Sequence, residues 1–138
     1  MIDHIGLSIS NLAKARAFYD AAFAPLGFSV VMEVTPQMTG GRFTALGYGP
    51  AGSDIAGLQS GKPSFWISDE GRTDPHVHVA FVAQDRGAVD AFHAAAVAAG
   101  WTDNGAPGLR PQYHPDYYGA FVLDPDGHNI EAVCHRPA

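Results

Sequence analysis

The chain has 138 residues, of which 46% are hydrophobic and 16% charged, a composition that is ordinary for a single globular domain and too apolar for a disordered chain. Eight basic residues oppose 14 acidic ones, for a formal net charge of −6. Because the basic residues are scattered along the chain, no phosphate-binding stripe and no nucleic acid partner are expected.

No targeting or membrane segment is expected either. The N-terminal MIDHIGLSIS lacks the basic region and apolar core of a signal peptide, and no apolar run approaches the roughly 18 residues of a membrane span. The only cysteine, Cys134, excludes an intramolecular disulfide and suits a reducing compartment. We therefore expect a cytoplasmic protein without a membrane partner.

The first half of the chain predicts the order strand, helix and then three strands. Residues 2–10 alternate between apolar and small or polar side chains, as in a half-buried strand. Asn11 can cap a helix with a regular apolar stripe, which Pro25 and Gly27 close. Three strand-like stretches follow at residues 28–34, 42–49 and 63–68.

The second half repeats this order from residue 76. Residues 76–83 predict a strand, and Asp85 can cap a helix that stops at Gly100. After the segment 101–116, for which no strand is predicted, strands are expected at residues 117–124 and 129–134, on either side of a DPDG turn. DPDG is a turn motif and lacks the glycine position of a calcium loop.

The two halves indicate a duplicated module. Shifting residues 4–24 by 74 positions onto 78–98 gives six identities in 21 positions, His4 with His78 among them. The matching order of strand, cap, helix length and stop carries more weight than these identities, which alanine inflates. We expect one domain, 1–138, with module one at 1–70, a linker at 71–75 and module two at 76–138.

Glu131 stands in the middle of an apolar strand, where an unpaired carboxylate costs several kcal/mol. His4 and His78 occupy equivalent positions on strand faces that carry mostly small residues. A pseudo-two-fold axis would bring both imidazoles to Glu131 as a facial triad for a divalent metal.

Other interpretations of these residues stay open. A lone strand histidine is more often structural, and a salt bridge explains Glu131 as well as coordination does. His76 shares the face of His78, although the 74-residue repeat favours His78, and His135 is a weaker alternative ligand. His93 and His128 are expected to be exposed to solvent.

Three motifs resemble the vicinal oxygen chelate superfamily, which includes glyoxalase I, extradiol dioxygenases, fosfomycin-resistance enzymes and bleomycin-binding proteins. They are His4-Ile-Gly-Leu-Ser-Ile, His78-Val-Ala-Phe and Phe121-Val-Leu-Asp-Pro-Asp-Gly-His-Asn-Ile-Glu131. The resemblance implies an α+β fold, in which two βαβββ modules form a U-shaped, incompletely closed mixed β-barrel with helices outside. It also implies a homodimer and a divalent metal (Zn, Fe, Mn or Ni) at His4, His78 and Glu131.

The departures from the family pattern favour three ligands. Glyoxalase I takes a fourth ligand from the stretch equivalent to residues 63–68, where this chain offers none before Asp69 and Glu70. Three-ligand chemistry, as in extradiol dioxygenases or fosfomycin-resistance enzymes, is therefore expected. The extradiol signature places a tyrosine where this chain has Phe121, so the reaction is not fixed.

The segment 109–119 is rich in polar aromatic residues. Among Tyr113, His114, Tyr117 and Tyr118, we favour His114 and Tyr118, and then Tyr113, as general acid or base. Arg110 is a candidate to bind an anionic group of the substrate. For each of these residues a structural role is equally compatible with the pattern.

These features predict a metal-dependent enzyme, namely a lyase, transferase or dioxygenase, acting on a small oxygen-rich or carbonyl substrate. Trp66, on the predicted fourth strand, is a candidate to line the pocket, although core packing is its usual role. The alternative is a metal-independent binding protein of the bleomycin-resistance type.

Overall fold

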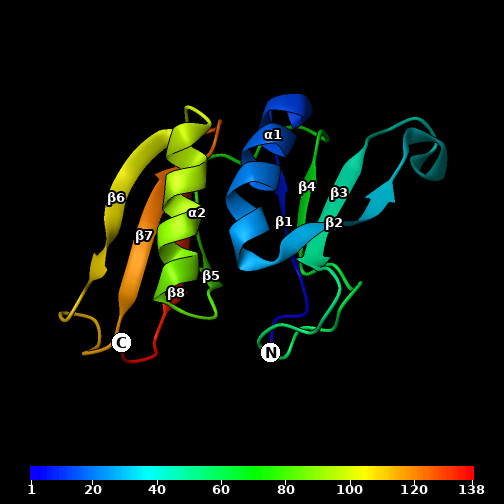
Figure 1. Ribbon diagram of the computed structural model, residues 1–138. Helices are drawn as coiled ribbons and strands as arrows, with labels where there is room; N and C mark the ends of the chain where they lie inside the picture. Colours follow the sequence, from blue (N-terminus) through cyan, green and yellow to red (C-terminus); the bar gives the residue numbers. More distant parts are fainter.

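The computed structural model describes residues 1–138 and has two four-stranded mixed sheets with two helices, which confirms the α+β fold (Figure 1). The first sheet has the order β1-β4-β3-β2 and the second β5-β8-β7-β6. The elements are β1 (Ile5–Ser8), α1 (Leu12–Phe23), η1 (Ala24–Leu26), β2 (Phe28–Val34), η2 (Pro36–Thr39), β3 (Ala45–Pro50), β4 (Phe65–Ser68), β5 (His78–Val82), α2 (Arg86–Ala98), β6 (Thr102–Leu109), β7 (Tyr118–Leu123) and β8 (Asn129–Cys134).

The two sheets have the same topology, as the duplication predicts. In each sheet the first strand pairs in parallel with the last, β1 with β4 and β5 with β8, and the other neighbours are antiparallel. The helices α1 and α2 run in opposite directions, side by side (Figure 1). β1 and β5 are edge strands of separate sheets, so one chain does not close a barrel.

Both predicted helix caps are present. Asn11 Oδ1 accepts a hydrogen bond from Lys14 N at 3.0 Å, and Asp85 Oδ1 accepts one from Ala88 N at 2.8 Å. Each bond satisfies an amide that has no partner inside the helix. After α1 the chain leaves the helical direction at Gly27, where φ is +78°.

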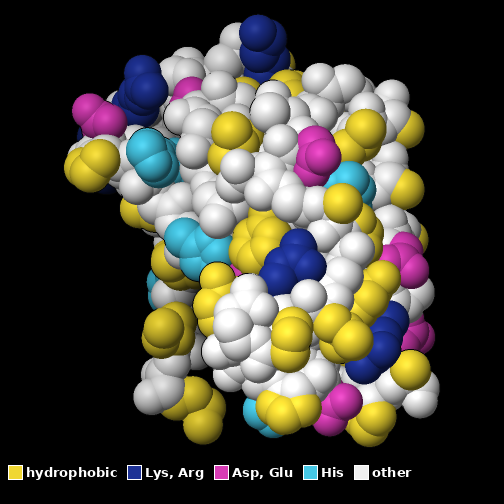
Figure 2. Space-filling view, turned by 90° about the vertical axis from the view of Figure 1, so that its left-hand side faces the viewer, with side chains coloured by type: hydrophobic (Ala, Val, Ile, Leu, Met, Phe, Trp, Pro, Cys, Tyr) yellow, Lys and Arg dark blue, Asp and Glu magenta, His cyan; other side chains and the backbone are white.

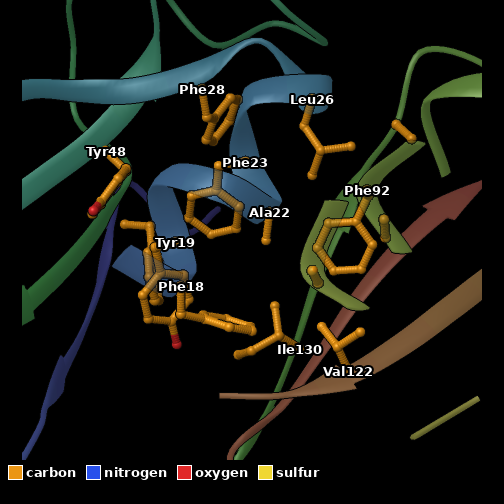
Figure 3. Packing of buried hydrophobic residues seen from close by; sticks show 14 of the residues in the cluster. Phe18, Tyr19, Ala22, Phe23, Leu26, Phe28, Tyr48, Phe92, Val122 and Ile130 are labelled. Atoms are coloured by element: carbon orange, nitrogen blue, oxygen red, sulfur yellow. The ribbon is translucent and has the colours of Figure 1, made fainter. Parts of the chain in front are cut away.

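One hydrophobic core joins the two modules (Figure 3). Phe18, Tyr19 and Phe23 of α1 are fully buried. Phe81 of β5 lies with its ring centroid 4.6 Å from that of Phe23 and 5.2 Å from that of Phe65 on β4. Full burial of such side chains contributes about 1.5–3 kcal/mol each, so the modules are held together by packing. Neither helix is long and apolar enough to cross a membrane.

The strand β6 was not predicted. Its sequence, TDNGAPGL, contains glycine, proline and short polar residues, which strands usually avoid. Two register shifts interrupt its pairing with β7, on either side of Gly105. Because β6 is an edge strand with these bulges, it tolerates Pro107. Tertiary pairing with β7 outweighs the weak strand propensity of the segment.

The DPDG turn is anchored from inside the protein. Asp124 accepts hydrogen bonds from the amides of Asp126 and His128, both at 2.9 Å, and from the Tyr19 hydroxyl at 2.7 Å. The prediction of an exposed His128 is wrong, because its ring is fully buried and Nδ1 accepts from Val77 N at 3.0 Å. The imidazole thus joins the final turn to the chain entering β5.

Candidate metal centre

Glu131 lies on β8 between β5 and β7, and its side chain is 2% exposed. Its carboxylate has two partners within the chain. Oε2 lies 3.0 Å from His78 Nε2, and Oε1 accepts a hydrogen bond from the Tyr117 hydroxyl at 2.5 Å. The buried carboxylate is therefore satisfied by side chains from the two neighbouring strands or their ends.

A glycine makes room for this carboxylate. A Cβ at Gly119 would lie 2.9 Å from Glu131 Oε1 and 3.2 Å from Tyr117 Cε1. Both contacts are closer than carbon normally allows, so any larger residue would push the carboxylate or the tyrosine ring away. The bare backbone of β7 at Gly119 is thus part of the site.

His78 is half exposed and has polar neighbours at both ring nitrogens. Nε2 faces Glu131, and Nδ1 lies 2.7 Å from Asn129 Nδ2. Asn129 Oδ1 in turn accepts from Asn104 Nδ2 at 3.1 Å. Such hydrogen bonds fix the orientation of an imidazole, as they do for metal-ligating histidines.

Tyr117 is the proton-bearing group closest to Glu131. Partial burial, together with the hydrogen bond and negative charge of Glu131, raises the pKa of Tyr117 to about 12. The phenol is therefore protonated at neutral pH and donates to the carboxylate. Its ring makes edge contacts with Tyr113, at 5.2 Å between centroids, and His135, at 5.1 Å.

These side chains line a hollow of about 350 Å³, whose walls are His78, Tyr113, Tyr117, Phe121, Asn129 and Glu131. The guanidinium of Arg110 lies 5.6 Å from the centroid of the Phe121 ring. On the face that carries β6, Lys and Arg side chains lie apart from one another (Figure 2). That face carries no continuous basic surface for a polyanion.

His4 does not join this site in the same chain. Its side chain is 58% exposed, and Nδ1 lies 2.7 Å from Asp3 Oδ1. β1 leads to the start of α1 and β5 to the start of α2, and these helices run in opposite directions (Figure 1). His4 and His78 therefore lie at opposite ends of the two strands. No group of three His, Cys, Asp or Glu side chains in the chain is placed to hold a metal ion.

Of the residues expected to transfer protons, Tyr113 lines the hollow and the other two do not. The hydroxyl of Tyr118 donates to Asp90 of α2 at 2.7 Å, on the helix side of the sheet. His114 is exposed, and its Nδ1 accepts from Asp116 N at 3.2 Å. His76 is exposed and precedes β5, so His78 is the histidine that contacts Glu131.

Trp66 occupies the position in the first sheet that Glu131 occupies in the second. It pairs with Gly6, as Glu131 pairs with Ala80, and these two partners are 74 residues apart. The indole lies over Gly47, where a Cβ would be 2.9 Å from Cη2. An indole offers donor capacity only and cannot act as a fourth metal ligand. Trp66 is half buried in the first sheet, outside the hollow.

Sequence reasoning named Tyr117 but favoured its neighbours. The register pairs Phe121 of β7 with Glu131, and the alternation of a strand places residues 119 and 117 on the same side as 121. Counting back in twos from Phe121 would have found both Gly119 and Tyr117. Asn129 had no comparable signal, because its role depends on the parallel pairing of β5 with β8.

The arrangement of two βαβββ-like modules agrees with comparisons to known proteins. A family model described as Glyoxalase/Bleomycin resistance protein/Dioxygenase superfamily matches residues 1–132. The chain therefore belongs to this superfamily. No curated protein matches the chain in a sequence search.

Solved structures with a similar fold include a glyoxalase/bleomycin resistance protein from Albidiferax ferrireducens T118, with 27% identity, a TM-score of 0.65 and 97% of each chain covered. A glyoxylase/bleomycin resistance protein/dioxygenase domain from Frankia sp. EAN1pec has 16% identity and a TM-score of 0.68, with 99% of this chain and 98% of that chain covered. Glyoxalase I from Zea mays has 18% identity and a TM-score of 0.64, and the match covers 96% of this chain but 45% of that chain. At these identities the last two show a shared fold alone.

Proposed function

We propose that this protein is a metal-dependent enzyme of the glyoxalase/dioxygenase type that acts on a small oxygen-rich or carbonyl substrate. The observation that carries the proposal is the pair of His78 Nε2 and Glu131 Oε2, 3.0 Å apart at a hollow of about 350 Å³. An imidazole and a carboxylate are ligands suited to Zn, Fe, Mn or Ni. The two side chains fit a divalent ion, and the chain supplies no third ligand beside them.

The third ligand in this proposal is His4 of a second copy of the chain. His4 is exposed next to the edge strand β1, and β5, which carries His78, is an edge strand as well. Apolar side chains are exposed near both strands, with Ile2 81% and Val82 55% accessible. We propose a homodimer that joins these two edges and covers both side chains.

Three protein ligands fit this chain better than four. The position in the first sheet that corresponds to Glu131 carries Trp66. Asp69 follows this strand, and its Oδ1 accepts a hydrogen bond from Thr44 N at 2.7 Å. Open positions on a three-ligand metal are available to substrate oxygens or water.

The bound metal would supply Lewis acidity, which stabilises an enolate or alkoxide as it forms. The chain's own residues supply the rest. Tyr117 fixes Glu131 and is the nearest proton donor, and Tyr113 lines the hollow beside it. Arg110 lies at the Phe121 wall and is proposed to bind an anionic group of the substrate. For proton transfer we propose Tyr113 and Tyr117, which line the hollow, whereas Tyr118 points to the helix side of the sheet and bonds Asp90.

Metal analysis of the purified protein after incubation with Zn, Fe, Mn or Ni tests the proposal. We expect His78→Ala and Glu131→Gln to lose bound metal and His4→Ala to weaken its binding. His76→Ala is the matched control, because His76 precedes the same strand without touching Glu131. Unchanged metal content in the first three variants would show that the ligand assignment is wrong. Oxygen uptake with catechols on Fe or Mn, against isomerisation or thiol addition on Zn or Ni, separates the reaction classes.

One observation favours a second candidate, a metal-independent binding protein. Both oxygens of Glu131 have partners within the chain, so the carboxylate is satisfied without an ion. The aromatic walls of the hollow, Tyr113, Tyr117 and Phe121, suit a planar ligand. A protein that takes up none of the four metals and binds a bulky planar compound tightly would favour this candidate.

A further inference from the structure

A row of hydrogen-bonded polar side chains runs from the edge of the second sheet into the hollow. Asn104 on β6 contacts Asn129 on β8, Asn129 contacts His78 on β5, and His78 contacts Glu131. Each contact is 3.1 Å or shorter. This row of side chains therefore connects Asn104, an exposed residue of the edge strand, to the buried carboxylate of Glu131.

The donors and acceptors along this row determine which ring nitrogen of His78 carries the proton. Asn104 Nδ2 donates to Asn129 Oδ1, which leaves Asn129 Nδ2 facing His78 Nδ1 at 2.7 Å. An amide nitrogen only donates, so Nδ1 must accept through its lone pair. The ring proton is then on Nε2, which faces Glu131 Oε2 at 3.0 Å. Asn129 and Glu131 select the same tautomer.

This tautomer cannot bind a metal through Nε2. A ligating imidazole nitrogen uses its lone pair, so the proton must move to Nδ1, where it needs an acceptor. Asn129 supplies one if its side-chain amide flips and turns Oδ1 toward the ring. Its Nδ2 then faces Asn104, which must present its own Oδ1. The backbone stays in place, because Asn129 N donates to Val77 O at 2.9 Å.

We propose that Asn104 and Asn129 are positioning residues, whose paired amides set which ring nitrogen of His78 carries the proton and so switch His78 between a metal-free and a metal-ready form. The metal-ready form rests on the function proposed above. The proton leaves Nε2 and arrives at Nδ1 through solvent, which reaches the half-exposed ring.

The ring proton can be located without any metal. We expect ¹⁵N-edited NMR of the metal-free full chain, at mildly alkaline pH, to show His78 protonated on Nε2 with a bare Nδ1. In Asn104→Asp the new carboxylate can only accept hydrogen bonds, so Asn129 should turn its Nδ2 toward residue 104 and its Oδ1 toward the His78 ring. His78 Nδ1 should then gain a proton. His128 is the internal control, because its Nδ1 accepts from the Val77 amide and should not change. A proton on Nδ1 of wild-type His78, or no change in Asn104→Asp, would overturn the proposal.

Zinc titration calorimetry tests the link to the metal. We expect Asn104→Asp to bind zinc more tightly than wild type, and Asn129→Leu, which has no acceptor for Nδ1–H, to bind it about 10- to 100-fold more weakly. Thr102→Asp adds the same charge on β6 without contacting Asn129 and should resemble wild type. Equal zinc affinities in Asn104→Asp and Thr102→Asp would contradict the proposed role of the paired amides. If wild type binds no metal at all, the proposed function fails, while the ring-proton result still decides the role of the amides.

Discussion

Two neighbouring tyrosines of this protein point to opposite faces of the second sheet. Tyr117 donates to Glu131 in the hollow, whereas Tyr118 donates to Asp90 on α2 and lies beneath the Arg86 guanidinium, 5.2 Å from the ring centroid. Successive side chains of a strand point to opposite faces, so one residue step separates the proposed site from the helix side. The pair offers a matched experiment.

We predict that Tyr117→Phe weakens divalent metal binding about 10- to 100-fold, because Glu131 loses the donor that orients it. Tyr118→Phe removes a hydroxyl from the adjacent residue and should bind metal as wild type does. Calorimetric titration of both variants measures the difference. The role given to Tyr117 would be wrong if the two variants bound metal equally well.

Gly119 gives a second prediction at the same scale. Gly119→Ala places a methyl group where Glu131 Oε1 lies 2.9 Å away, so we expect the carboxylate to shift. Overpacking of this kind costs about 1–3 kcal/mol of the free energy of unfolding, and metal affinity should fall with it. Gly6→Ala is the control, since its new methyl group would meet nothing closer than 3.7 Å. Urea unfolding and metal titration of both variants supply the comparison, and a Gly119→Ala protein that matches Gly6→Ala in both would contradict it.

At the residue scale the sequence predicted part of the proposed site. The 74-residue repeat selected His78 over His76, and the cost of burying a carboxylate selected Glu131. The composition of the segment 109–119 indicates residues able to transfer protons. Which of its four polar aromatic residues faces Glu131 follows only from the register of β7 against β8. The buried His128 escaped because a position beside a turn does not indicate which side chains fold inward.

At the scale of elements, a buried hydrogen bond links the final hairpin to the first helix, in addition to the packing of the core. The Tyr19 hydroxyl on α1 donates to Asp124, which also binds two amides of the turn before β8. Burial, and then the charge of Asp124, raises the pKa of Tyr19 well above its ordinary value. The phenol remains a donor, so helix and turn stay joined.

We predict that Tyr19→Phe lowers the free energy of unfolding by about 1–3 kcal/mol, because it leaves a buried carboxylate short of a donor. Tyr48→Phe also loses a hydroxyl that donates to a carboxylate, that of Asp20. The Asp20 side chain is 49% exposed, so water can replace the lost donor. The loss in Tyr48→Phe should be smaller. Denaturant unfolding of both variants compares them, and a larger loss in Tyr48→Phe would contradict the role of Asp124.

Elements with strong local signals were predictable, and the one governed by its neighbours was not. Asn11 and Asp85 mark the helix starts that the structure has, and residues 28–34 form a strand with the expected limits. β6 has no strand signal, since TDNGAPGL is typical of a loop. It becomes a strand because β7 offers it a hydrogen-bonding edge.

At the scale of the whole molecule, the repeat predicted two equivalent histidines that meet at Glu131, whereas within one chain only His78 contacts this carboxylate and His4 lies apart from it. A pseudo-two-fold axis makes His4 and His78 equivalent wherever it stands, and it brings them together only if it passes near both. In this chain the helices α1 and α2 pack side by side and run in opposite directions (Figure 1). The two strand starts therefore lie at opposite ends, and in the proposed dimer a second copy would approach each of them.

The metal content of a mixed dimer tests most directly whether the metal site is shared between two copies of the chain. A His4→Ala chain and a Glu131→Gln chain carry different tags, are co-expressed, and are purified as the heterodimer. If His4 of one copy completes the site of the other, one of the two sites is intact, and the heterodimer holds about half of the wild-type metal although either homodimer is deficient. A heterodimer as poor in metal as the two homodimers would contradict a site shared between copies.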